Sequence, residues 1–185
     1  MRRTLLAIAV LGGCYFEARP GVTAPIGHGH GGAGFDLGFA VGGEYANAQR
    51  RVGAGINVGP RLANDNGYTP VAVEAHAVIP LVGETFGSMH RLLLTTHAAA
   101  GFAIGLTDFG PGMQPRSPDG AVAEVFVGLG LGATETRPVV EVTAGHVALG
   151  LSVKRFWPES AGSFWMIGAA LEVSYSFQNG GQWAR

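Results

Sequence analysis

Hydrophobic and small or polar side chains alternate with a period of two through most of the chain from Gly34 onward. In the first such segment, Phe35, Leu37 and Phe39 share one face, and Asp36 lies on the other. Successive side chains of a β-strand point to opposite faces, so this period predicts strands. The same pattern recurs in seven segments, which span 35–42, 51–59, 71–79, 91–106, 124–132, 139–153 and 165–177.

The strand count is expected to be even. The segment 139–153 changes phase near Ala144-Gly145, which indicates a bulge or a tight turn that divides it into two strands. That division would give about eight strands, and bacterial membrane barrels have even numbers. Asn66-Gly67 is typical of a hairpin turn. The sequence therefore predicts an all-β fold, a single antiparallel up-and-down β-barrel of about eight strands over residues 33–177.

The two faces of these strands differ in a way that favours a membrane environment. One face carries large apolar residues, and the other is mostly glycine and alanine with about one charged residue a strand. A glycine facing water in mid-strand weakens the strand, whereas a glycine facing a narrow lumen leaves room for large polar neighbours. Only 14% of the residues are charged, against roughly 25% in soluble domains. We therefore expect the large residues to face lipid.

The N-terminal residues predict export. Arg2 and Arg3 precede the apolar stretch 4–11, which is too short to cross a bilayer as a helix and fits a secretory signal. The next residues, Leu11-Gly12-Gly13-Cys14, resemble the lipobox of bacterial lipoproteins. That resemblance implies a cleaved signal over 1–13 and lipidation of Cys14. The alternative is a conventional signal with a chance cysteine.

The segments at either end of the predicted barrel are expected to lie outside it. Residues 14–32 are rich in glycine and proline and predict a flexible tether. His28 and His30 lie in it without further ligands nearby, so we assign them no metal. Residues 178–185 are expected to form a C-terminal tail.

The whole alternating region, Gly34 to Phe177, resembles the small Gram-negative outer-membrane barrels of the OmpA transmembrane-domain and OmpX architecture. Its last strand ends in Tyr175-Ser176-Phe177, which looks like the terminal signal read by the outer-membrane insertion machinery. The resemblance implies location in the bacterial outer membrane, with membrane lipids and that machinery as partners. The lipobox departs from the family pattern, and a lipid-tethered periplasmic barrel is the alternative location.

The small-residue face projects a set of polar side chains into the predicted lumen. Buried charges must be paired and hydrogen-bonded, so we expect a polar network that largely plugs the barrel and gives it a structural or interaction role. The alternatives are a narrow transport pore and a lipocalin-like pocket for a small molecule. The predicted network contains Asp36, Arg51, Glu74, His76, Arg91, His97, Glu124, Glu141, His146 and Glu172, with Glu44 on the same face.

Catalysis is not predicted by any motif. A lipid hydrolase would need a hydroxyl beside a histidine and a carboxylate. His146, Ser152, Ser174 and Glu172 offer those groups, but no local motif places them together. We predict no enzyme activity, no metal and no cofactor. The net charge of −1 without a basic stripe gives nucleic acid no binding surface.

Overall fold

The computed structural model describes residues 13–26, 32–46, 51–63, 67–82, 90–105, 119–136, 141–159 and 162–179. Every regular element in these ranges is a strand. Among them no helix is long and apolar enough to cross a bilayer. The strands are β1 (Gly13–Ile26), β2 (Gly34–Ala46), β3 (Arg51–Val58), β4 (Arg61–Ala63), β5 (Tyr68–Val82), β6 (His90–Gly105), β7 (Gly120–Thr136), β8 (Glu141–Pro158) and β9 (Phe164–Asn179).

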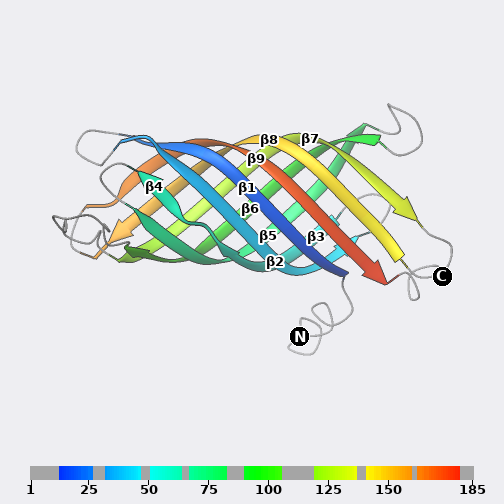
Figure 1. Cartoon of the computed structure of the whole chain (residues 1–185), viewed down its shortest axis with the longest axis horizontal. Coiled ribbons are helices and arrows are strands. Elements are labelled where there is room, and N and C mark those ends of the chain that lie inside the picture. Colours follow the sequence, from blue (N-terminus) through cyan, green and yellow to red (C-terminus); the bar gives the residue numbers. More distant parts are fainter. Residues whose placement is uncertain are drawn as a thin grey trace.

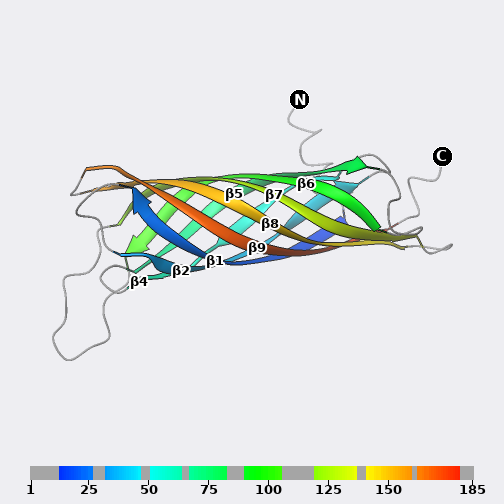
Figure 2. The same cartoon turned by 90° about the horizontal axis from the view of Figure 1, so that it is seen from above.

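The strands close into an antiparallel up-and-down barrel. Strands that follow one another in the sequence pair with each other, except β3 and β4, and β1 pairs with both β2 and β9, which closes the sheet. The short β4 continues β3 beyond Gly59-Pro60, and both lie between β2 and β5. The nine strands thus fill eight positions, as the sequence predicts. The beginning of β1 and the end of β9 lie at the same end of the barrel, which we call the terminal end; the other is the loop end (Figures 1 and 2).

The prediction of a flexible tether over 14–32 is wrong for residues 14–26, which belong to the strand β1. β1 lies in the wall, with Cys14 opposite Phe177 of β9 and Gly43 of β2. Pro20 can lie in this strand because it falls where the ladder to β9 is interrupted, between Ala18 and Gly21. A proline lacks the N–H that an unbroken ladder needs. Residues 27–31, with His28 and His30, lie outside the described ranges.

The predicted break in the segment 139–153 is also wrong. β8 runs unbroken from Glu141 to Pro158 and pairs with β7 in one register, with Gly145 opposite Ala133. The eighth position comes from β1 instead. At the other limit, β9 extends to Asn179, so the predicted tail from 178 begins inside the wall, and its remaining residues, 180–185, lie outside the described ranges.

The large apolar side chains point outward, as expected. Val73, Phe102 and Leu149 are 69%, 74% and 68% exposed, and they lie on three different strands. The interior holds the small and polar face together with a few aromatic residues. At the loop end Tyr68 and Phe156 stack inside the barrel with their rings 5.1 Å apart. Those two aromatic residues therefore belong to an inner core rather than to the outer surface.

Candidate functional site

The polar interior depends on glycines that leave space for larger neighbours. A Cβ atom on Gly53 would overlap Cε1 of His76, and one on Gly128 would lie 2.9 Å from Cε1 of Phe126. Both approaches are closer than carbon atoms allow, so side chains there would displace the ring. Glycine in mid-strand, which costs conformational entropy, thus makes room for the interior rings.

At the terminal end, Arg51 and His146 connect a carboxylate of β2 with one of β9. His76 Nε2 lies 2.8 Å from Glu44 Oε2, and Arg51 Nε lies 3.5 Å from Glu44 Oε1. An Arg51 guanidinium nitrogen lies 2.6 Å from His146 Nδ1. The other ring nitrogen of His146 hydrogen-bonds Glu172. All five side chains are at least nine-tenths buried, so they form one water-excluded group.

Glu74 of β5 is the centre of the network. Its Oε2 accepts hydrogen bonds from Arg19 and, at 2.6 Å, from the Asn57 amide. Its Oε1 lies 3.1 Å from His97 Nδ1. Arg19 also contacts Glu17, with Nε 2.6 Å from Oε1. The Arg19 guanidinium lies 5.4 Å from the centre of the Phe126 ring, which packs inside the barrel. Residues of five strands, β1, β3, β5, β6 and β7, thereby meet in the lumen.

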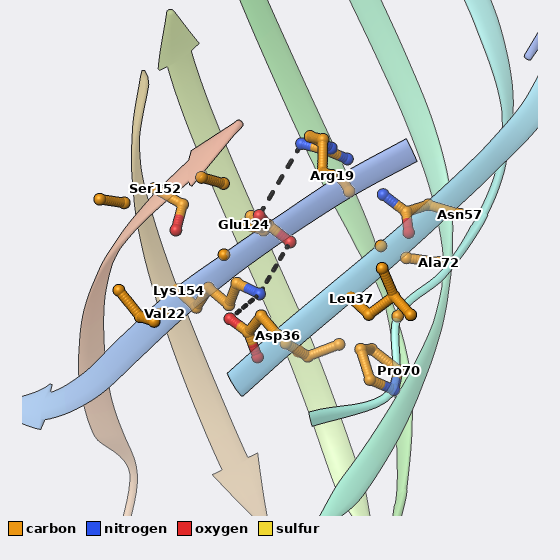
Figure 3. A pocket seen from close by; sticks show the side chains of 17 residues that line it. Arg19, Val22, Asp36, Leu37, Asn57, Pro70, Ala72, Glu124, Ser152 and Lys154 are labelled. Carbon is orange, nitrogen blue, oxygen red and sulfur yellow. Dashed lines mark hydrogen bonds and ion pairs between the residues drawn. The ribbon is translucent and has the colours of Figure 1, made fainter. Parts of the chain in front are cut away.

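Toward the loop end the same chain of charges continues through β7, β8 and β2. Figure 3 shows Arg19 pointing at Glu124, Glu124 at Lys154, and Lys154 at Asp36. Lys154 Nζ donates a hydrogen bond of 2.7 Å to Asp36 Oδ2, while the two contacts of Glu124 are longer, at 3.8 and 3.6 Å. A cavity of about 30 Å³ lies among these residues, which is room for about one water molecule.

Negative groups outnumber positive ones among the described interior side chains. Six carboxylates face three permanently charged cations, and three histidines lie between them. Some of this excess must be offset by protons or by another cation, because charges out of water need partners. The carboxylates are Glu17, Asp36, Glu44, Glu74, Glu124 and Glu172, and the cations are Arg19, Arg51 and Lys154.

The structure places most of the predicted network residues inside the barrel and in contact. Two predicted residues cannot be placed in the network: Arg91 is the second residue of β6 and Glu141 is the first of β8, and the side chains of both lie outside the described part. The predicted residues brought together are Asp36, Arg51, Glu74, His76, His97, Glu124, His146 and Glu172.

The four residues considered for a lipid hydrolase do not all come together in the barrel. Ser152 and His146 lie on the same strand, β8, six positions apart, and a strand rises about 3.3 Å per residue, so roughly 20 Å separates them. His146 does contact Glu172, and Ser174 is opposite His146 in the register. Ser152 is therefore out of reach of His146, and both ring nitrogens of His146 are engaged by Arg51 and Glu172, which leaves neither of them to take a proton from Ser174.

Several interior residues were missed because β1 was not recognised as a strand. Tyr15, Glu17, Arg19 and Thr23 are all buried on its inner face. A signal was present: they alternate with outward residues such as Phe16 and Val22, which are 51% and 61% exposed. Polar residues of other strands, such as Asn57, Thr95 and Lys154, were also left out of the predicted network, because the first two carry no charge and the third lies just beyond the segment 139–153.

Comparison of the sequence with known protein families and with curated proteins finds no match. Among solved structures, the fold is similar to the crystal structure of Neisserial surface protein A. The TM-score is 0.55 at 11% sequence identity, covering 87% of this chain and 95% of that one. A major outer membrane protein from Thermus thermophilus aligns with a TM-score of 0.33 at 12% identity, covering 88% of this chain and 99% of that one. At such identities the first likeness shows the barrel fold alone.

Proposed function

We propose that the protein is an integral outer-membrane β-barrel of the cell envelope, with a structural or interaction role and a lumen closed by its ion-pair network. The observation that carries this proposal is the inverted arrangement of side chains. Charged residues fill the inside, as in the Arg19–Glu74 pair, and large apolar residues cover the outside. In water, an apolar outer surface of this extent would be costly, whereas the hydrocarbon of a bilayer offers it a matching solvent.

Strand length supports the proposal. The strand β2 has 13 residues and β8 has 18, and about 9–11 tilted residues suffice to cross the hydrocarbon. Trp157 and Trp165 face outward at the loop end, while Tyr175 and Phe177 face outward at the terminal end. Aromatic side chains at both ends of the wall are typical of residues at the two membrane interfaces.

The filled interior favours a closed barrel over the two alternatives. Arg19 contacts carboxylates of three strands in the middle of the lumen, Glu17, Glu74 and Glu124. An ion would have to break these contacts to pass. The cavity of about 30 Å³ beside Lys154 is far below the roughly 300 Å³ at which small-molecule pockets begin. The described interior therefore favours neither a pore nor a lipocalin-like pocket. A larger hollow of about 620 Å³ lies against outward-facing side chains of the wall such as Phe16 and Phe39.

Lipidation of Cys14 is part of the proposal. Cys14 is exposed on the outer face of β1 near the terminal end, in line with Phe16. A thioether-linked lipid at this position would lie against the apolar outer surface. The last strand, β9, reaches Phe177 directly opposite Cys14. We expect this strand to be the one that the insertion machinery recognises.

Membrane retention without the lipid tests the spanning barrel. Residues 1–13 are replaced by an ordinary cleavable signal and Cys14→Ser is introduced, so that neither a leader nor a lipid can anchor the chain. We expect the protein to stay in the membrane after alkaline carbonate washing and to migrate differently in unheated and boiled gel samples. The unaltered chain is the matched control. Release of a folded protein into the soluble fraction would instead support the tethered periplasmic barrel.

Conductance in planar bilayers tests the closed lumen. The wild-type protein is expected to give no steady current. The double variant Arg19→Ala/Glu74→Ala removes the central pair without leaving either partner alone, and should open a small cation-selective path because carboxylates remain in excess. A control with Arg155→Ala/Glu159→Ala removes two charges outside the lumen and should stay silent. Steady current through the wild-type barrel would contradict the proposal.

A further inference from the structure

Two interior histidines, one on β5 and one on β6, each face a carboxylate with the same ring nitrogen. His76 Nε2 lies 2.8 Å from Glu44 Oε2, and His97 Nε2 lies 3.2 Å from Glu172 Oε1. A carboxylate on Nε2 favours the tautomer in which that nitrogen carries the proton. On His76 the other nitrogen, Nδ1, then has a free lone pair, whereas Nδ1 of His97 lies within hydrogen-bonding distance of a second carboxylate, that of Glu74.

The Nδ1 atoms of His76 and His97 lie in an interior rich in carboxylates, where a cation would be stabilised. His97 Nδ1 lies 3.1 Å from Glu74 Oε1 and 3.5 Å from Glu17 Oε2. A lone pair and two carboxylate oxygens at these distances repel one another unless a proton or a metal ion lies between them. His76 Nδ1 has no hydrogen-bond partner among the described residues, although the side chain is only 6% exposed.

The backbone holds these donors together. His76 and His97 are opposite each other in the β5–β6 register. Glu74 precedes His76 by two residues, so both point inward. One ligand atom from each of the three side chains lies within 4.8 Å of the others. Two imidazoles and a carboxylate are a donor set suited to zinc and similar ions.

We propose that Glu74, His76 and His97 bind a divalent first-row transition metal ion inside the barrel. Zn²⁺ is the ion used to test the site. Glu44 and Glu172 would hold the two rings from behind, in the carboxylate–histidine–metal arrangement that fixes ligand orientation.

The neighbouring groups of Glu74 leave one oxygen for the ion. Arg19 and Asn57 both donate to Oε2, so the carboxylate is oriented with Oε1 toward His97. The excess of interior carboxylates over cations also favours a bound divalent ion. This inference does not rest on the proposed function, because a water-soluble barrel with the same interior would hold the same site.

Zinc content of the refolded full chain tests the site. The chain is refolded in detergent with ZnSO₄ and desalted, and metal is measured in the fraction that shows the folded gel mobility. We expect about one zinc per chain, with a loss of at least about tenfold in His97→Gln. The control His28→Ser/His30→Ser removes two histidines outside the described ranges and should keep the zinc. Folded wild-type protein without zinc, zinc unchanged by His97→Gln, or zinc lost in the control would each overturn the proposal.

X-ray absorption of the wild-type zinc complex tests the ligands without any variant that might misfold. The expected shell contains nitrogen and oxygen only, with the outer scattering of two imidazoles. Scattering from sulfur would assign the metal to Cys14, the single cysteine of the chain. A shell with sulfur, or one without two imidazoles, would therefore overturn the proposal.

Discussion

Replacing Arg19 with methionine is expected to lower the free energy of unfolding of the folded barrel by about 3–5 kcal/mol, because the change leaves buried carboxylates without their cation. Arg19 is 5% exposed and contacts Glu17, Glu74 and Glu124. Methionine keeps much of the length and the packing against Phe126. The loss of unfolding free energy therefore measures the removal of the positive charge rather than a change in side-chain volume. Urea-induced unfolding in detergent micelles or vesicles, followed by gel mobility and tryptophan fluorescence, measures it.

The same substitution at Arg155 is the matched control. Arg155 lies on the outer face between Trp157 and Trp165, at 5.1 and 4.9 Å from their rings. An exposed contact of this kind contributes about 0.5–1 kcal/mol, so Arg155→Met should have a small effect. Equal losses at the two positions would show that Arg19 does not compensate buried charge.

A second variant separates the charge effect from a general loss of packing. Arg19→Met/Glu74→Gln removes the cation and the negative charge of its main partner together. Replacing both members of a buried pair costs much less than removing one of them. We expect the double variant to be more stable than Arg19→Met alone. A double variant with the sum of two full losses would contradict the assignment of Glu74 as that partner.

A strand of this fold could be predicted from the sequence where its residue types favour a strand, and was missed where they favour a turn. In β7 and β9 the alternation is nearly regular, broken by the inward-facing Phe126 and Met166, and both the wall position and the outward direction of most large side chains followed from it. In β1 the alternation competes with Pro20, Gly21 and Pro25, residue types that favour turns and tethers. Pairing on both sides, with β2 and β9, overrides that local preference.

The candidate site could be predicted as a list of inward residues but not as a set of contacts. Alternation fixed the face of Glu74, His76 and His97. Which side chains meet depends on the register between strands, and His76 is opposite His97 only because β5 and β6 pair as they do. Arg19, which joins three carboxylates, came from the strand that was not predicted. The centre of the network was therefore out of reach of the sequence alone.

Replacing Leu149 with arginine distinguishes a lipid-facing wall from a water-facing one. Leu149 is 68% exposed, lies near the middle of β8, and is opposite Leu129 and Leu171 on the neighbouring strands. Arginine at the midplane of a membrane barrel costs about 2–4 kcal/mol, and the cost falls to about 0–1 kcal/mol near the interface. We therefore expect a large loss of unfolding free energy for Leu149→Arg in lipid vesicles.

The same change at the end of a strand provides the control for depth. Ile26 is 55% exposed and ends β1 at the loop end, so Ile26→Arg should cost little in the same vesicles. If the wall faced water, both substitutions would fall within about 0.5 kcal/mol of wild type, as exposed changes usually do. A difference between the two positions therefore requires a medium whose polarity changes along the barrel, which a bilayer provides and water does not.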